Sequence, residues 1–288
     1  MRILITGAAG RLGGRLFDML SPEHAVTGVD VVAKEGVEAL DITDFAAVRS
    51  VLHEAKPDIV LHPAAWTDVE GCANDQDRAI AINGLGAGNV AVAAQECGAA
   101  IVYISSNEVF DGVSERAYRE YDPTNPINPY GYSKLVGEKA VIAANSRHYI
   151  VRTAWLFAHG GKNFIQAILG AAASGKRLRV VTNEIANPTY NDDLADAIVA
   201  LIETERYGVY HLTNAGQCSR YAFARYVLDR AGYADTLIQP ITSQEWPRAS
   251  QPPVYAALAN QAGAMMGITL RPWRDAVDAF LEQEGLLK

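Results

Sequence analysis

Cysteine and histidine are scarce in this chain. The 288 residues include 3 cysteines and 6 histidines, and no CxxC, HxxxH or HExxH spacing occurs among them. A disulfide framework needs paired cysteines, and structural zinc sites use such short ligand spacings. The sequence therefore predicts neither, and we expect no metal ion among the functional residues.

Basic clusters and membrane-length apolar runs are also missing. Lys and Arg number 25 against 33 Asp and Glu, which gives a net charge of −8 and argues against nucleic-acid binding. The most membrane-like stretch, Ala79–Gln95, is free of charge but contains three glycines and two asparagines. It is shorter than the ~20 residues that a membrane span needs. Because no signal-peptide pattern follows the N-terminal MRILITG, we expect a cytoplasmic protein without a membrane partner.

Short β-branched runs alternate with helical patterns through the first half of the chain. Strands are predicted at Arg2–Thr6, Ala25–Asp30, Ile59–His62, Ala100–Ser105 and Tyr149–Arg152, and helices at Leu12–Leu20, Asp44–Ala55, Gln76–Cys97 and Tyr130–Ala144. Strands without polar alternation, separated by long helices, indicate a parallel sheet covered on both faces. The predicted fold class is α/β, a doubly wound Rossmann-type sheet with ligands at the carboxyl ends of its strands.

Glycine and proline interrupt the pattern after residue 152. Further helices are predicted at Asp192–Glu203, Tyr221–Arg230 and Trp273–Gln283, and further strands at Leu178–Val181 and Val209–Leu212. We expect residues 1–154 and 183–213 to form a dinucleotide-binding domain. Residues 155–182 and 214–288 would form a smaller substrate-binding lobe over the strand ends.

A glycine-rich loop, GAAGRLG, follows the first predicted strand and opens a helix. In a βαβ unit, Gly7 permits the tight turn, Gly10 lets the backbone approach a pyrophosphate, and Gly13 lets the helix pack on its strand. The helix N-terminus, at Arg11 and Leu12, directs backbone N–H donors toward the anion. These positions predict an NAD(H) or NADP(H) site.

Asp30 ends the second predicted strand, 23 residues after Gly7. A carboxylate there can accept both hydroxyls of the adenosine ribose. It would also repel a 2′-phosphate, so Asp30 favours NADH over NADPH, although Arg11 could offset part of that repulsion.

The segment NPYGYSK carries a predicted helix start, with Asn128 as N-cap and Pro129 at the first helical position. Tyr130 and Lys134 are four residues apart and therefore share one helix face. A nearby ammonium favours the phenolate, so we expect Lys134 to lower the pKa of Tyr130. In the reductive direction Tyr130 would give its proton to the forming alkoxide, while Lys134 would bind the nicotinamide ribose. Tyr132 has no lysine four residues later, so it lacks the cationic partner that Tyr130 has.

A serine pair ends the strand that precedes this helix. A hydroxyl there can hydrogen-bond the substrate carbonyl and orient it for hydride transfer. Alternation along the strand directs only one of Ser105 and Ser106 toward the site, and the residues themselves leave the choice open.

Taken together, these motifs resemble the dTDP-4-dehydrorhamnose reductase family of extended short-chain dehydrogenase/reductases, which reduce a 4-keto-6-deoxy nucleotide sugar. The resemblance covers nearly the whole chain. It also includes Pro57–Val60, Ala64–Glu70, Ala81–Asn83, Val109–Gly112, Arg152–Trp155, Asn163–Phe164, Asn187–Thr189 and Asp193–Ala195.

The resemblance implies roles for individual residues. It makes Ser106 the catalytic hydroxyl, with Tyr130 as proton donor and Lys134 as its partner. The adenine-contacting pair corresponds to Asp41 and Ile42, and the loop over the cofactor to Ala64, Ala65 and Trp66. The substrate-facing positions correspond to Ser106, Asn107, Glu108 and Trp155.

The chain departs from the family at the substrate-facing positions. The family usually has STDYVF where this chain has SSNEVF, so Asn107 and Glu108 replace an aspartate and a tyrosine. Gln251 stands where the family has an arginine before a proline. An added carboxylate and a lost arginine both disfavour a nucleotide diphosphate. The hydride chemistry is therefore better supported than the dTDP-sugar substrate.

The predicted function is NAD(P)H-dependent reduction of the 4-keto group of a 6-deoxy sugar, with a nucleotide-linked sugar as small-molecule partner. One alternative is an epimerase or dehydratase of the same superfamily, since its dehydratases use a carboxylate near the position of Glu108. Another is a non-catalytic NAD(P)-binding regulatory subunit, against which the intact Ser106, Tyr130 and Lys134 argue. A homodimer is compatible with the sequence.

Overall fold

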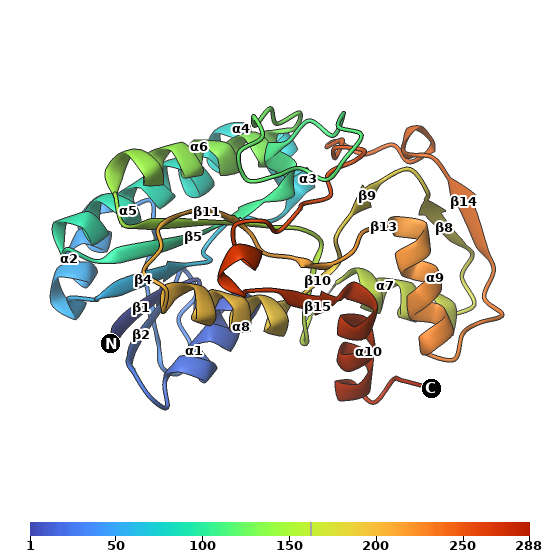
Figure 1. Ribbon diagram of the computed structural model, residues 1–288, viewed down its shortest axis with the longest axis horizontal. Helices are drawn as coiled ribbons and strands as arrows, with labels where there is room; N and C mark the ends of the chain where they lie inside the picture. The colour runs from blue at the N-terminus through green and yellow to red at the C-terminus, as the bar shows by residue number, and fades with distance from the viewer. Residues whose placement is uncertain (162) are drawn as a thin grey trace.

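The computed structural model describes residues 1–161 and 163–288 and is built around a seven-stranded sheet (Figure 1). Its strand order is β11-β6-β5-β4-β1-β2-β3, and every neighbouring pair is parallel. The strands are β1 (Arg2–Thr6), β2 (Ala25–Asp30), β3 (Val37–Ala39), β4 (Ile59–His62), β5 (Ala100–Ser106), β6 (His148–Thr153) and β11 (Gly208–His211). This order confirms the predicted α/β class, because the chain winds outward in both directions from β1.

Helices cover both faces of the sheet. They are α1 (Arg11–Leu20) and α8 (Asn191–Ile202) on one face, and α2 (Phe45–Ala55), α5 (Ala87–Glu96) and α6 (Pro129–Ala144) on the other (Figure 1). Alternate residues of β1 serve the two layers: Ile3 and Ile5 pack in the cluster of α1 and α8, and Leu4 packs in the cluster of α2 and α5. Both faces of these strands are apolar because both are buried.

The helix predicted over Gln76–Cys97 is divided into three parts. It consists of α4 (Gln76–Ala79), a π-helical segment η1 (Ile80–Gly86) and α5. In η1 the glycines allow close packing on α6, because a Cβ on Gly84 would lie 2.7 Å from the Val136 side chain. The short elements β3 and α3 (Val69–Asn74) were not predicted.

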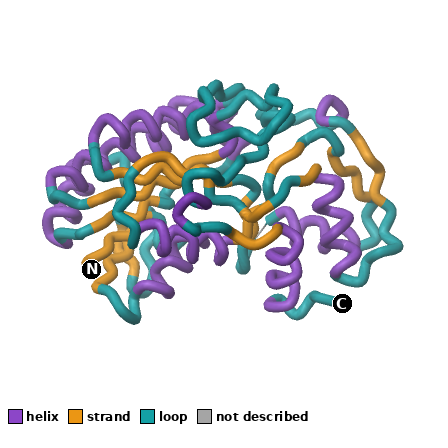
Figure 2. Tube along the Cα trace, viewed as in Figure 1, coloured by secondary structure: helices purple, strands orange, loops and turns teal. Residues whose placement is uncertain are grey.

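A second apolar cluster lies beside the sheet, where α7 (Phe164–Ala173), α9 (Arg220–Arg230) and α10 (Trp273–Gln283) pack together (Figures 1 and 2). Phe157, Phe223, Phe280 and Trp273 contact one another at its centre. Helix α7 was not predicted. The domain limits proposed from the sequence remain a prediction.

The remaining elements are short. They are the strands β7 (Leu156–Phe157), β8 (Leu178–Val181), β9 (Ile185–Ala186), β10 (Thr189–Tyr190), β12 (Asn214–Ala215), β13 (Cys218–Ser219), β14 (Ile238–Ile241) and β15 (Leu270–Pro272), and the 3₁₀ turns η2 (Asn107–Val109), η3 (Ser243–Glu245) and η4 (Ala264–Met266). Within residues 1–161 and 163–288, no helix combines the length and the apolar character that crossing a bilayer requires.

Candidate active site

A cavity of about 1140 Å³ opens at the carboxyl ends of the central strands. Every site residue predicted from the sequence lines it: Gly7, Gly10, Arg11, Leu12, Gly13, Asp30, Asp41, Ile42, Ala64, Ala65, Trp66, Ser106, Asn107, Glu108, Tyr130, Lys134 and Trp155. Residues from distant parts of the sequence therefore share one site, as the doubly wound fold requires. Their individual roles remain predictions.

The glycine loop has the geometry of an anion cradle. Gly7 has φ +64°, and a Cβ there would lie 2.8 Å from the Ala64 backbone. A Cβ on Gly13 would lie 2.1 Å from the Gly7 carbonyl oxygen, so only glycine allows α1 to start this close to its strand. The N-cap of α1, Gly10, provides no side-chain cap. The first N–H groups of α1 are thus available to a pyrophosphate, and the loop fits a dinucleotide.

Asp30 lies beside this loop at the end of β2. Its Oδ2 accepts a hydrogen bond from the Ala9 N–H at 3.0 Å, and its Oδ1 accepts one from the Val32 N–H at 3.1 Å. Each carboxylate oxygen keeps a further lone pair for a ligand hydroxyl. The Asp41 carboxylate accepts bonds from the Thr43 N–H and hydroxyl at 2.9 and 2.8 Å, so it also orders the turn before α2.

The loop of Ala64, Ala65 and Trp66 is fixed by a buried asparagine. Asn83 accepts a hydrogen bond from the Trp66 N–H at 2.7 Å and donates one to the Trp66 carbonyl at 3.0 Å. The guanidinium of Arg78 lies 4.6 Å from the centre of the Trp66 ring. No role was predicted for Asn83 by itself; its only signal in the sequence was its place in the segment Ala81–Asn83.

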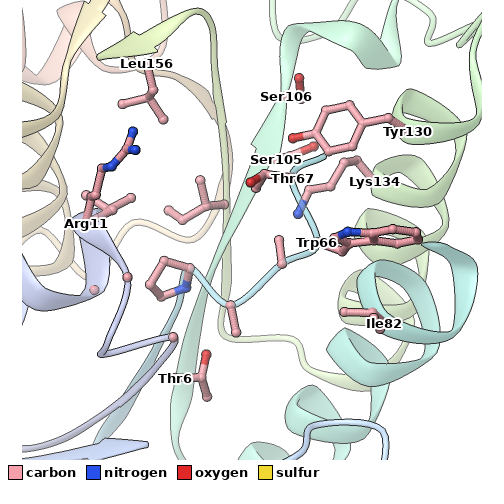
Figure 3. Close-up of a pocket in the computed structure, with 18 of the residues that line it drawn as sticks. Thr6, Arg11, Trp66, Thr67, Ile82, Ser105, Ser106, Tyr130, Lys134 and Leu156 are labelled. Atoms are coloured by element: carbon pink, nitrogen blue, oxygen red, sulfur yellow. The ribbon is translucent and has the colours of Figure 1, made fainter. Parts of the chain in front are cut away.

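The structure distinguishes the two serines. Ser105 donates a hydrogen bond to the buried carboxylate of Glu138 at 2.5 Å. The Ser106 oxygen instead accepts one from the Glu108 N–H at 3.2 Å, and the Ser106 hydroxyl donates to the Asn107 side-chain oxygen at 3.3 Å. Ser106 also lies close enough to the Tyr130 phenol to act on its pKa. Figure 3 shows Ser106 beside the Tyr130 ring. Ser106 is thus the serine that meets Tyr130.

Helix α6 starts as predicted, with Pro129 first and the Asn128 side chain accepting the Gly131 N–H at 2.8 Å. Tyr130 and Lys134 project from it into the cavity (Figure 3). The pKa of Tyr130 is raised, and not lowered as the sequence predicted, because burial and the Glu108 charge outweigh the hydrogen bond from Ser106. The phenol is therefore protonated at neutral pH.

Lys134 is 2% exposed, and its Nζ lies 4.2 Å from the centre of the Tyr103 ring. Burial lowers the pKa of Lys134 to about 7, although the nearby charge of Glu138 opposes this shift. The His62 ring stacks on Tyr103 behind it, and burial together with the charge of Lys134 lowers the pKa of His62 to about 3. A neutral imidazole thus lies behind a lysine that titrates near neutrality.

The part of the cavity predicted to face the substrate combines an acid and an arginine. Glu108 accepts a hydrogen bond from the Asn128 side chain at 2.6 Å, and burial raises its pKa. Asn107 donates to the Ala256 carbonyl at 3.1 Å. Arg220, which was not predicted as a site residue, stacks on Trp155 with 3.6 Å between the guanidinium carbon and the ring centre. No pattern around residue 220 distinguishes this arginine from a surface residue of a helix.

Across the part of the chain that the structure describes, no group of three or more His, Cys, Asp or Glu side chains is arranged to hold a metal ion. The fold and site are those of a dinucleotide-binding Rossmann protein with the serine–tyrosine–lysine set of short-chain dehydrogenase/reductases.

Comparison with known proteins gives the family. The model of the RmlD substrate binding domain matches residues 1–285. The spore coat polysaccharide biosynthesis protein SpsK of Bacillus subtilis is 36% identical over 282 residues, covering 98% of this chain and 97% of SpsK. The chain therefore belongs to the RmlD family, that of the dTDP-4-dehydrorhamnose reductases, as its motifs predicted.

Solved structures agree. A dTDP-4-dehydrorhamnose reductase of Clostridium acetobutylicum superposes with a TM-score of 0.92 at 36% identity, covering 99% of this chain and 100% of that one. The dTDP-4-dehydrorhamnose reductase of Bacillus anthracis, solved in complex with NADP, gives 0.90 at 35% identity, with 98% and 99% covered.

Proposed function

We propose that this chain catalyses the NAD(P)H-dependent reduction of the 4-keto group of a nucleotide-linked 6-deoxy sugar. The observation that carries this proposal is the protonated, half-buried Tyr130 beside Ser106, in the same cavity as the glycine cradle. The relatives named dTDP-4-dehydrorhamnose reductase supply the substrate class.

The residues divide the work between binding and proton transfer. The uncapped N-terminus of α1 holds the pyrophosphate of the cofactor, whose nicotinamide supplies the hydride when bound. Ser106 donates a hydrogen bond to the substrate carbonyl and fixes its orientation. Tyr130 gives its phenolic proton to the oxygen as negative charge develops there. Lys134, in its ammonium form, stabilises the phenolate left behind.

The test is the oxidation of NADH in the presence of 4-keto-6-deoxy nucleotide sugars. We expect Tyr130→Phe to lower kcat by about 10²- to 10⁴-fold, which is the usual contribution of a positioned general acid. Tyr132→Phe is the matched control, since Tyr132 lies on the same helix but is 52% exposed. Equal activity of the two variants would contradict the role of Tyr130.

A second candidate function follows from Glu108, whose half-buried side chain lines the same cavity as Ser106 and could serve the acid–base chemistry of a dehydratase or epimerase. Conversion of the sugar without net consumption of NADH would favour that function. Tight cofactor binding with no turnover of any sugar would favour a regulatory subunit.

For the cofactor, we propose a preference for NADH. The support is the Asp30 carboxylate, which lies against the glycine loop where a 2′-phosphate would add a second negative charge. We expect kcat/KM for NADH to exceed that for NADPH by at least about 10-fold, which corresponds to ~1.4 kcal/mol. Asp30→Asn should narrow this ratio by restoring NADPH use. A wild-type protein that prefers NADPH would contradict the proposal.

A further inference from the structure

Arg220 is the first residue of α9 and lines the substrate-facing end of the cavity. Its guanidinium carbon lies 3.6 Å from the centre of the Trp155 ring and 5.2 Å from that of Phe164. These contacts hold the planar group in place without using its N–H donors. Within residues 1–161 and 163–288, no oxygen accepts a hydrogen bond from this guanidinium.

The positive charge of Arg220 is also without a contact ion pair among the described residues. Glu108 is the nearby acid, but its carboxylate is bound to the Asn128 side chain at 2.6 Å. Burial lowers the pKa of Arg220 to about 10, which leaves the group a cation at neutral pH. A partly buried cation with unused donors is costly unless an anion completes it.

The backbone beneath this arginine is strained. Trp155 has φ +42°, in the left-handed region that a residue with a bulky side chain rarely adopts. Its carbonyl accepts a hydrogen bond from the Thr189 N–H at 3.2 Å, which ties the strained residue to β10. Such strain is retained where a side chain must be held in one place. Here it places the indole under the guanidinium.

Two other arginines line the cavity, at parts assigned to the cofactor. Arg11 belongs to the glycine loop, and Arg78 stacks on Trp66. Arg220 instead comes from α9 and shares its end of the cavity with Glu108. The anion that it is placed to bind therefore belongs to the substrate.

We propose that Arg220 binds the diphosphate of the nucleotide-linked substrate. A guanidinium fixed by stacking can present two parallel N–H groups to phosphate oxygens, which a flexible lysine cannot do. This assignment rests on the proposed function for its substrate class. It also supplies a positive charge that the glutamine at position 251 does not.

The test measures binding of dTDP and of thymidine to the NADH-loaded protein by calorimetry. We expect Arg220→Gln to weaken dTDP binding by about 10- to 100-fold, as for the loss of one or two charge-assisted hydrogen bonds. Thymidine and NADH should bind as they do to the wild type. Arg220→Lys should recover only part of the affinity for dTDP, because lysine keeps the positive charge but lacks the two parallel N–H donors. In turnover, KM for the sugar substrate should rise more than kcat falls.

Arg274→Gln is the matched control. Arg274 also stacks on a tryptophan, Trp273, at 4.6 Å, but it does not line the cavity. Unchanged dTDP affinity in Arg220→Gln, equal losses of dTDP and thymidine affinity, or an equal loss in Arg274→Gln would each overturn the assignment. If the wild type binds dTDP through Arg220 but oxidises no NADH with any 4-keto sugar, the proposed reaction fails while the diphosphate site stands.

Discussion

Burying the ammonium of Lys134 carries a large electrostatic cost. Its side chain is almost completely buried, and its ring contact with Tyr103 does not replace the water that the ammonium loses. The pKa near 7 means that the folded protein binds this proton less tightly than the unfolded chain does. Burying such a residue lowers the free energy of unfolding, as is common for residues at functional sites.

Substitution of Lys134 should therefore stabilise the fold in a pH-dependent way. The pKa is about 7 in the folded state and ~10.4 in the unfolded chain, so the cost of burial is full below pH 7 and declines as pH rises toward 10. We expect Lys134→Met to raise Tm by several degrees at pH 6.5 and by much less at pH 9.5. Calorimetric scans at both pH values measure this difference, and a Tm gain that grows with pH would contradict the account.

The same pKa should appear in the kinetics. The value of kcat/KM for NADH reports groups that titrate in the free enzyme. If the ammonium of Lys134 is the active form, kcat/KM should fall as pH rises through about 7. A stopped-flow or steady-state profile from pH 5.5 to 9 tests this, and the fall near pH 7 should be missing from the residual activity of Lys134→Met. If the wild-type kcat/KM does not change over this pH range, the ammonium of Lys134 is not the active form.

Single residues also show where sequence reasoning stops. The spacing of Tyr130 and Lys134 predicted a shared helix face, but not that burial and Glu108 would raise the pKa of the phenol. The sequence alone could not distinguish Ser105 from Ser106. In the structure, Ser105 donates a hydrogen bond to Glu138 of α6, which is 33 residues away along the chain. These outcomes depend on neighbours in space and not on local pattern.

At the scale of elements, the π-helical segment η1 supports the loop of Ala64, Ala65 and Trp66. It carries Asn83, which is 1% exposed and bonds both backbone groups of Trp66 and the Ser133 hydroxyl. π-helical turns are often found at functional sites. In this chain the segment lets one side chain connect the loop after β4 to helix α6.

We expect Asn83→Ala to weaken NADH binding by about 10-fold, because the loop that lines the cofactor site loses its support, at a cost of ~1–3 kcal/mol for unpaired buried groups. Asn145→Ala is the control. Asn145 is equally buried and donates to the Ala99 carbonyl at 2.9 Å, away from the cavity. It should lower Tm without changing NADH affinity. NADH affinity of both variants is measured by titration with NADH, followed by tryptophan fluorescence. Equal NADH affinities of the two variants would contradict the role of η1.

The elements that the sequence predicted are those with strong local signals. Strands β1, β2 and β4 match their β-branched runs, and α6 starts at its Asn-Pro cap. Helix α7 was not predicted because its alanine-rich apolar run follows closely after the pair Gly160 and Gly161, which suggested a loop. The division of the helix after Gln76 was not predicted because it arises from packing against α6.

At the scale of the whole molecule, the net charge of −8 coexists with a cavity whose geometry suits phosphates. The glycine loop offers backbone N–H groups and the dipole of α1, which leave the net charge unchanged. Arg220 and Glu108 carry the charge of another part of the cavity wall. Local geometry, and not overall charge, therefore decides which anions bind.

The most direct test of the central claim is the transfer of deuterium from reduced cofactor labelled at the nicotinamide C4. The wild-type protein is incubated with a dTDP-4-keto-6-deoxy sugar, and the product is analysed by NMR and mass spectrometry. We predict one deuterium at C4 of the sugar for each NADH consumed, and none with Tyr130→Phe at the same time point. A sugar product that carries no deuterium, or that forms without consumption of NADH, would contradict the account.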